Sequence, residues 1–346
     1  MANLIEVKDL RVEFQLREGL VRAVNGVSFS VPAGHTLGIV GESGCGKSVT
    51  AKALLQILPT RARIAGGRIL LAPREGENGG EPLDLVRLPP DSNAMRRIRG
   101  ADIAMIFQEP MTSFSPVHTI GNQIMESVRL HQRKTRADAR EIAIEMLRRV
   151  RVPMPERRVD AYPHELSGGL RQRCMIAMAL ACNPRLLIAD EPTTALDVTI
   201  QAQILNLIEQ LQKDLRMSVL IITHNLGVIA ETADDVAVMY LGRIVEQGSM
   251  EEVFRNPMHP YTRGLMESMP HLRQGRRKRL ASIRGTVPDP FSIPRGCPFH
   301  PRCDEFMKGV CDAGPIPPLE EVAAGHNAAC FLYPRCRSAL EMQTSL

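Results

Sequence analysis

Two stretches near the start of the chain alternate apolar and polar residues. They are LIEVKDLRVEF at residues 4–14 and AVNGVSFSV at residues 23–31. Successive side chains of a strand point to opposite faces, so alternation is typical of a strand with one covered face. The pattern therefore predicts two strands in this part of the chain.

Three later runs consist mainly of apolar residues: DIAMIFQ at 102–108, RLLIAD at 185–190 and SVLIIT at 218–223. Between the last two, residues 200–215 have the period of a helix. Short apolar runs separated by a helix are typical of parallel strands that are covered on both faces. The pattern thus predicts an α/β fold, and AVMYLGRIVEQG at residues 237–248 predicts a final hairpin.

A helical pattern fills most of the chain between Pro110 and Pro184. Within it, residues 135–150 begin with a cap-like Thr135-x-x-Asp138 and place apolar side chains on one helical face. We therefore expect a mostly helical insert between two parts of the α/β core.

Composition is that of an ordinary globular protein, with 44% hydrophobic and 23% charged residues. No apolar stretch approaches the roughly 18 residues of a membrane span, and the N-terminus lacks the pattern of a signal peptide. These features predict a cytosolic chain. The net charge is +5, and residues 273–279 (RQGRRKR) form a basic run. We interpret this run as part of a solvated linker at 271–295, with anionic lipid or nucleic acid as the alternative partner.

A glycine-rich segment follows the apolar run TLGIV and precedes a helical pattern. It fits G-x-x-x-x-G-K-[ST], which is credible as a phosphate loop in that context. Backbone N–H groups of such a loop and the start of the helix face phosphate oxygens. We expect Lys47 to pair with the β and γ phosphates and Ser48 to ligate Mg²⁺. The residues predicted to contact nucleotide are Gly41, Glu42, Ser43, Gly44, Cys45, Gly46, Lys47, Ser48 and Val49.

Two carboxylates end the apolar run at 185–190 and differ in the role that we expect. Asp190 suits a place just outside the direct ligands of Mg²⁺, whereas Glu191 can polarise a water for in-line attack on the γ-phosphate. An acidic pair at a strand end is often only surface, but its position after a phosphate loop favours the catalytic interpretation.

Together these residues resemble the ATPase subunits of ATP-binding cassette transporters. The segment 166–172 (LSGGLRQ) looks like the signature of that family, Gln108 like its Q-loop, 195–197 (ALD) like its D-loop and His224 like its switch histidine. The resemblance covers roughly residues 3–270. It implies a P-loop NTPase fold of the cassette type, in which residues 1–270 comprise a RecA-like core (1–109 and 185–270), an antiparallel β subdomain and a helical subdomain (110–184).

The resemblance also assigns roles at the nucleotide site. Ser167, Gly168 and Gly169 would face a phosphate held by a second subunit, so each ATP lies between two cassettes arranged head to tail. The resemblance makes Asp197 a nucleotide-binding residue and gives His224 a role in catalysis. Gln108 would touch Mg²⁺ and the start of the helical insert, and residues 109–113 would lie near the membrane partner.

Phe14 is the candidate for stacking on adenine, with a place in the core as the alternative. The chain departs from the family pattern at Leu170, after the signature glycines, and at Asn225, after the histidine. Neither departure removes a group that contacts phosphate.

Five of the eight cysteines crowd into the last 50 residues, and a reducing compartment argues against disulfides. Their C-x5-C-x7-C-x18-C spacing lacks the knuckles of a structural zinc site and suits an iron–sulfur cluster at least as well. Free thiols in a tail are the remaining alternative. The residues in this pattern are Cys297, Cys303, Cys311 and Cys330, with Cys336 left over.

The segments MHPYT at 258–262 and GCPFHPRC at 296–303 resemble the C-terminal extension of the oligopeptide and dipeptide permease branch. That resemblance implies a cysteine-rich extension at 296–346 whose four cysteines hold a 4Fe–4S cluster. A structural staple is the default role of the cluster, and redox sensing is the alternative.

The branch implies an ATPase that powers import of peptides, or of nickel or oligosaccharides, from the cytoplasmic face of the inner membrane. Its partners would be a second, homologous cassette, two transmembrane permease subunits and an extracytoplasmic binding protein. A cassette ATPase acting on nucleic acid is a weaker alternative, because the chain has neither a second cassette nor a long coiled-coil insert.

Overall fold

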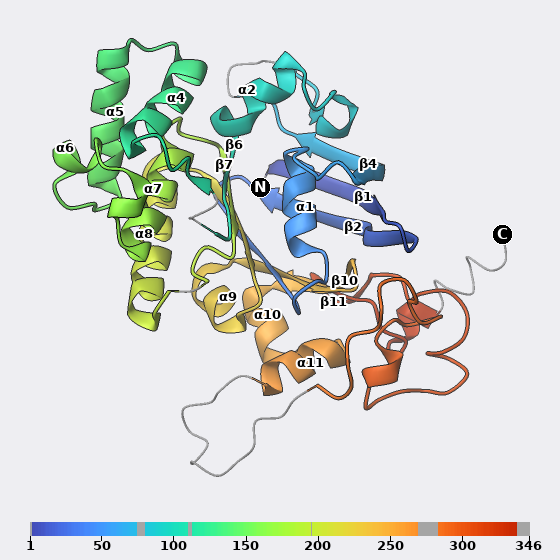
Figure 1. Ribbon diagram of the computed structural model, residues 1–346. Helices are drawn as coiled ribbons and strands as arrows, with labels where there is room; N and C mark the ends of the chain where they lie inside the picture. Colours follow the sequence, from blue (N-terminus) through green and yellow to red (C-terminus); the bar gives the residue numbers. More distant parts are fainter. Residues whose placement is uncertain (1, 75–79, 110–112, 195, 269–282, 338–346) are drawn as a thin grey trace. The chain divides into compact units, whose positions relative to one another are not determined.

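The computed structural model describes residues 2–74, 80–109, 113–194, 196–268 and 283–337, which form two compact units (Figure 1). The first unit comprises Met1–Ile5, Ser30–Thr36 and Leu70–Ile222. The second comprises Glu6–Phe29, Leu37–Ile69 and Thr223–Leu346. Each unit therefore combines segments that are far apart in the sequence, and the domain limits inferred from the motifs stay predictions.

Parallel strands form the centre of the first unit. Strand β7 (Leu186–Asp190) pairs in parallel with β6 (Ile103–Ile106) on one side and β8 (Ser218–Thr223) on the other. Every residue of the three strands is buried, which explains why their sequences are apolar without alternation. The predicted buried parallel strands are thus confirmed. A two-residue strand, β5 (Leu83–Asp84), pairs antiparallel with Leu70 and Leu71.

Helices make up most of the rest of the first unit (Figure 1). The hydroxyl of Thr135 accepts the N–H of Asp138 at 3.2 Å, so the expected cap begins a helix there. Helices α4, α5 and α7 pack against one another, and α7 also packs against β6. The helices are α2 (Asn93–Ala101), α4 (Ile120–Gln132), α5 (Arg136–Arg149), α6 (Pro155–Arg158), α7 (Gly168–Leu180) and α8 (Val198–Leu215).

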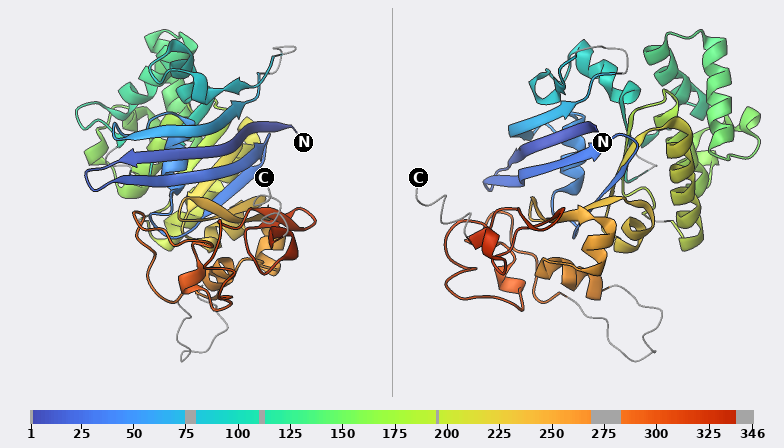
Figure 2. Two further views of the ribbon diagram at one scale, coloured as in Figure 1. Left: turned by 90° about the vertical axis from the view of Figure 1, so that its right-hand side faces the viewer. Right: turned by 180° about the vertical axis from the view of Figure 1, so that it is seen from behind.

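A sheet of long strands opens the second unit. Strand β1 (Asn3–Gln15) lies between β2 (Leu20–Pro32) and β4 (Ala62–Leu71), as Figure 2 shows. Leu16 and Gly19 exchange backbone hydrogen bonds, so β1 and β2 form a hairpin. Both alternating stretches of the sequence are therefore strands, as predicted.

The second unit also contains strands in the order β11-β12-β10-β9-β3. Strand β3 is parallel to β9, whereas β9–β10, β10–β12 and β11–β12 are antiparallel. The predicted hairpin at 237–248 is confirmed as β9 and β10, but it is not the final one. Strand β12 has only three residues, too few to give a recognisable pattern. The bounds are β3 (Thr36–Val40), β9 (Asp235–Tyr240), β10 (Arg243–Ser249), β11 (Glu320–Ala323) and β12 (His326–Ala328).

Short helices complete the second unit. Helix α10 packs against β9, β10 and α9, and η3 is a single 3-10 turn in the cysteine-bearing segment. Among the residues that the structure describes, no helix combines the length and apolar character that a membrane span requires. The bounds are α1 (Lys47–Leu54), α9 (Leu226–Thr232), α10 (Met250–Arg255), α11 (Pro260–Glu267) and η3 (His300–Arg302).

Candidate functional site

The predicted phosphate loop lies in the second unit, between the buried strand β3 and helix α1. Its two end glycines are sterically required. A Cβ on Gly41 would lie 2.1 Å from the carbonyl oxygen of Met239, and one on Gly46 would lie 2.3 Å from that of Ala23. Gly46 also has a φ of 104°, which side chains rarely allow. The loop is therefore pressed against its neighbours, and only glycine permits that approach.

Lys47 is buried, and its ammonium group is held by the loop itself. The Nζ atom donates to the carbonyl oxygens of Gly41 at 2.7 Å and Glu42 at 3.0 Å. Ser43 and Gly44 at the tip of the loop are exposed, and Ser48 and Val49 are half-buried. A positive charge, a helix start and an exposed turn thus meet at one place, which is the arrangement that binds phosphate.

Two further predicted site residues belong to the same unit. Phe14 is half-buried on β1 and is not among the buried core residues of the described chain. His224 is exposed between β8 and α9. The next residue, Asn225, caps α9 by accepting the N–H of Gly227 at 2.9 Å, which explains an amide at this position.

The acidic pair lies in the first unit, directly at the end of β7. Both Asp190 and Glu191 are buried. The Glu191 carboxylate accepts hydrogen bonds from the Gln108 amide at 3.1 Å and from the Thr194 hydroxyl at 2.9 Å. The structure therefore joins Gln108 and Glu191, which the sequence placed 83 residues apart. Thr194 was not predicted, and no sequence signal distinguishes it from its neighbour Thr193.

The signature segment also lies in the first unit and opens helix α7. Ser167 stands at the N-cap position, but its hydroxyl does not bond to the helix that it precedes. Ser167 and Gly168 are exposed, and a Cβ on Gly168 would meet nothing within 4 Å. The first turn of α7 thus presents a hydroxyl and backbone N–H groups outward, as the signature interpretation requires.

Asp197 has a structural role of its own as the cap of α8, where its carboxylate accepts the N–H of Ile200 at 2.9 Å. Some predicted positions lie outside the described residues. They are Ala195 of the D-loop segment, residues 110–112 after the Q-loop, and the basic run 273–279.

Three of the four pattern cysteines, Cys297, Cys311 and Cys330, are buried, and Cys303 is half-buried. Burial, reinforced by the neighbouring thiols, raises the pKa of Cys297 to about 11 and that of Cys330 to about 12. The four thiols are thus near enough to influence one another. Cys336 is buried separately and donates to the carbonyl oxygen of Ala328.

The chemistry of these donors fits a metal cluster, since four thiols share a largely buried region. Their arrangement does not itself form a metal site. Across the described ranges, no three His, Cys, Asp or Glu side chains form a group that could hold a metal ion.

The cysteine-bearing extension is joined to the rest of the second unit by a buried carboxylate. Glu246 on β10 is fully buried and accepts the backbone N–H groups of Met258 at 2.6 Å and His259 at 2.9 Å. His326 on β12 lies 2.7 Å from the same carboxylate. The MHPYT motif and the extension therefore contact the same buried residue of the sheet.

Comparison with protein families gives two matches along this chain. Residues 24–194 match the family described as ABC transporter. Residues 245–311 match the family described as oligopeptide/dipeptide transporter, C-terminal region.

Curated relatives are similar over nearly their whole length. The probable peptide ABC transporter ATP-binding protein y4tR of Sinorhizobium fredii is 54% identical, over 95% of this chain and 94% of the relative. The oligopeptide transport ATP-binding protein OppD of Escherichia coli is 46% identical, over 95% and 93%. The oligopeptide transport ATP-binding protein OppD of Bacillus subtilis is 48% identical, over 96% of this chain and 89% of the relative.

Two solved structures share the fold. A dimeric ATP-binding cassette, MJ0796, bound to ADP and Pi after hydrolysis, gives a TM-score of 0.61 at 24% identity. The alignment covers 71% of this chain and 98% of that one. The cbiO1 protein of Clostridium perfringens, part of the ABC transporter complex cbiONQ, gives 0.60 at 25% identity, over 74% and 92%.

Proposed function

Because the chain belongs to the ABC transporter ATPases that carry the oligopeptide/dipeptide C-terminal region, we propose that it hydrolyses ATP to power peptide import. The predicted fold class agrees with that of the solved cassettes. The observation that supports the proposal is the local geometry of two groups that we assign to phosphoryl transfer. One is the phosphate loop with Lys47, and the other is the Glu191 carboxylate held by Gln108 and Thr194.

At the phosphate loop, we assign Lys47 to the β and γ phosphates and the start of α1 to the same anion. Binding would release the Lys47 ammonium from the carbonyl oxygens that it now contacts. Ser48, Gln108 and Asp190 would hold Mg²⁺, which supplies charge neutralisation when bound. Phe14 would stack on adenine, and its partly exposed ring is suited to that.

At the end of β7, we assign to Glu191 the positioning and deprotonation of the attacking water, with His224 beside the γ-phosphate. The hydrogen bonds from Gln108 and Thr194 restrict where the Glu191 carboxylate points. Because Gln108 also precedes the helical insert, it is suited to report the state of the site to that insert.

A second cassette completes the site in this proposal. The outward-facing Ser167 and Gly168 would contact ATP held by the other subunit, and Asp197 would lie at the same interface. A homologous companion rather than a copy of this chain is the partner that we favour.

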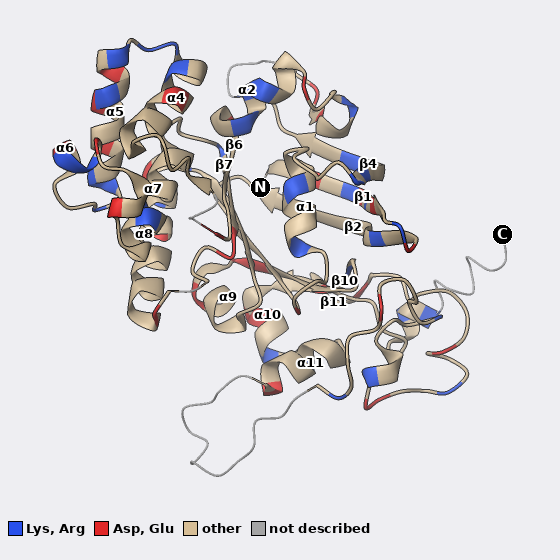
Figure 3. Cartoon of the chain, in the orientation of Figure 1, with Lys and Arg blue, Asp and Glu red and all other residues tan. Residues whose placement is uncertain are grey.

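Two transmembrane permease subunits and an extracytoplasmic binding protein complete the proposed importer, with this chain peripheral on the cytoplasmic face of the inner membrane. The helical part of the first unit offers exposed apolar side chains for the membrane subunits. Val117 is 74% exposed and Leu130 on α4 is 70% exposed. Nucleic acid is not among the proposed partners. Helix α5 carries charges of both signs (Figure 3). Its Arg148 and Arg149 are paired with Glu145.

Uptake by reconstituted vesicles tests the function. The full complex with its binding protein should accumulate labelled short peptides only with ATP on the cassette side. Glu191→Gln, combined with the matching change in the companion cassette, should abolish uptake while ATP stays bound. Glu209→Gln, an exposed change on α8, is the matched control and should transport normally. Accumulation of nickel or an oligosaccharide in place of peptides would contradict the peptide assignment and leave the ATPase assignment intact.

We further propose that Cys297, Cys303, Cys311 and Cys330 hold a 4Fe–4S cluster, with zinc as the less favoured metal. The burial of three of these thiols and the closeness of all four support this, and a staple is the role that we favour over redox sensing. Iron, sulfide and zinc analysis of protein purified without oxygen tests it. The Cys→Ser change at any of the four should remove iron, whereas Cys336→Ser should retain it. Zinc in place of iron, or no metal, would contradict the cluster.

A further inference from the structure

An ion pair links the cysteine-bearing segment to the phosphate loop, across 260 residues of sequence. Arg302 stands between Cys297 and Cys303 on the turn η3, and only 4% of its side chain is exposed. Its two terminal nitrogens donate to the two carboxylate oxygens of Glu42, at 2.7 and 3.0 Å. A two-pronged pair of this kind is strong and fixes both partners in orientation.

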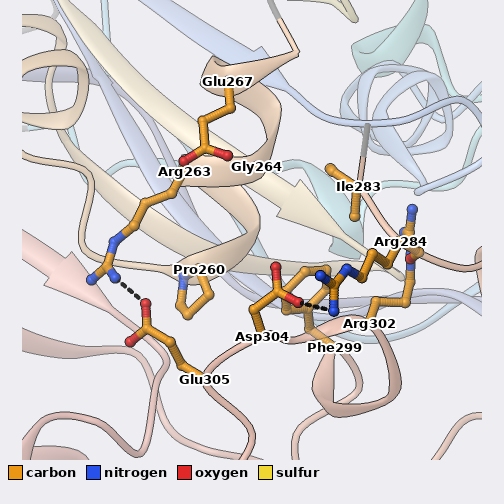
Figure 4. A pocket seen from close by; sticks show the side chains of 10 residues that line it. All are labelled: Pro260, Arg263, Gly264, Glu267, Ile283, Arg284, Phe299, Arg302, Asp304 and Glu305. Atoms are coloured by element: carbon orange, nitrogen blue, oxygen red, sulfur yellow. Dashed lines mark hydrogen bonds and ion pairs between the residues drawn. The ribbon is translucent and has the colours of Figure 1, made fainter. Parts of the chain in front are cut away.

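The remaining contacts of Arg302 leave its guanidinium little freedom. Its Nε donates to the carbonyl oxygen of Arg284 at 3.0 Å. The guanidinium carbon lies 5.9 Å from the ring centre of Tyr240 and 6.0 Å from that of Phe299. Figure 4 shows Arg302 beside Phe299 and Arg284 at the edge of a pocket of about 410 Å³. The guanidinium of Arg302 is therefore fixed in orientation, and we call its ion pair with Glu42 the clamp.

The first turn of the phosphate loop is held from the same side by a second group. The backbone N–H of Glu42 donates to the hydroxyl of Tyr261 at 2.9 Å, and Tyr261 is fully buried against Tyr240 and Phe299. The carbonyl oxygen of Glu42 accepts from Lys47. One residue, Glu42, thus connects Arg302 and Tyr261 to the lysine that we assign to phosphate.

Charge gives the clamp a second purpose. The carboxylate of Glu42 belongs to a loop that is built to receive a highly negative ligand, and a carboxylate there would repel it. Arg302 supplies the balancing charge at hydrogen-bonding distance. If Arg302 were removed, a half-buried carboxylate without that partner would remain beside the phosphate site.

We propose that Arg302 is a positioning residue of the nucleotide site, which holds the carboxylate of Glu42 and thereby makes ATP binding depend on the cysteine-bearing segment. The inference rests on the proposed function. It adds a residue that neither the phosphate-loop motif nor the cysteine pattern includes, and it gives the stretch between Cys297 and Cys303 a direct task at the site.

Steady-state hydrolysis by the purified complex, with the companion cassette inactivated, tests the proposal. The change Arg302→Gln should raise KM for ATP at least about 10-fold and lower kcat much less, because the clamp acts on binding. The double variant Arg302→Gln with Glu42→Gln should recover a large part of the lost affinity, since the repelling carboxylate is gone. Added salt should reduce the rise in KM that Arg302→Gln causes, because salt screens the repulsion between the Glu42 carboxylate and ATP.

The matched control is Arg263→Gln. Arg263 anchors the extension through Glu305, Tyr333 and the carbonyl oxygen of Met258, and the structure gives it no contact with the phosphate loop. The change Arg263→Gln should therefore leave KM for ATP within about twofold of the wild-type value. Should Arg302→Gln fail to fold, Arg302→Lys retains the charge without the two-pronged geometry and should raise KM less, but measurably.

Three results would overturn the proposal: an unchanged KM in a folded Arg302 variant, a double variant as weak as the single, or an equal rise in KM for Arg263→Gln. Should no arginine variant fold, hydrogen exchange decides. Amides of residues 41–47 should exchange faster in Glu42→Gln than in wild type, and unchanged exchange overturns the clamp. A wild-type complex that bound no ATP would instead refute the proposed function.

Discussion

At the scale of single residues, Glu191 has a backbone conformation that side chains rarely adopt, with a φ of 48°. Its N–H donates to the carbonyl oxygen of Ile222 at 2.8 Å, and its carboxylate is held by Gln108 and Thr194. Such strain persists only where the surroundings fix it. We infer that the turn after β7 is shaped to direct this one carboxylate.

Thr194→Val should lower kcat for ATP hydrolysis about 10-fold, because it removes a side-chain hydrogen bond that orients the Glu191 carboxylate. ATP binding should change little, since the substituted hydroxyl is assigned to no phosphate. Phosphate release together with nucleotide affinity measures both quantities. The control is Thr60→Val at an exposed turn, which should match wild type. A wild-type kcat in Thr194→Val would show that the hydrogen bond does not orient the Glu191 carboxylate for hydrolysis.

At the scale of elements, helix α11 begins with an unusual cap. The Nδ1 atom of His259 accepts the N–H of Tyr261 at 3.0 Å, which requires a ring without a proton on that nitrogen. Burial, opposed by Glu246 and reinforced by Arg263, lowers the pKa of His259 to about 4. The helix that supplies Tyr261 to the phosphate loop is therefore held by a neutral histidine.

The buried cap should make stability depend on pH. The unfolded chain binds a proton at His259 below about pH 6.5, whereas the folded chain does so only near pH 4. The stabilisation from the neutral ring is therefore complete above pH 6.5 and is lost as pH falls toward 4. In His259→Asn, the side-chain oxygen can still accept the N–H of Tyr261, and the titrating ring is removed.

Urea unfolding at pH 7.5 and pH 5 measures this contribution. Between the two values, wild type should lose about 2 kcal/mol more of its free energy of unfolding than His259→Asn. Equal losses in the two proteins would mean that the ring of His259 does not titrate differently in the folded state.

Elements with local signals were predictable. The phosphate loop has fixed spacing, α5 has its Thr135 cap, and the buried strands have apolar runs. Contacts between distant segments were not predictable, because no local pattern records them. The pairing of β12 with β10 depends on a three-residue strand. The contacts of Glu191 with Gln108 and of Glu42 with Arg302 join residues 83 and 260 positions apart.

At the scale of the whole molecule, the residues to which we assign the chemistry are divided between the two compact units. The phosphate loop, Phe14 and His224 lie in the second unit, and the Glu191 cluster and the Ser167 turn lie in the first. The proposal adds a second cassette, whose Ser167-like turn covers the triphosphate. ATP then links two cassettes, and hydrolysis releases them.

Light scattering on Glu191→Gln protein tests this central claim most directly, using the chain with its companion cassette. The account predicts that ATP joins this chain, whose mass is 38.3 kDa, to its companion cassette as a pair. Adding Ser167→Arg should prevent pairing while Lys47 still binds ATP. Protein that binds ATP and stays unpaired at every concentration, or pairs equally well with Ser167→Arg, would contradict the shared site.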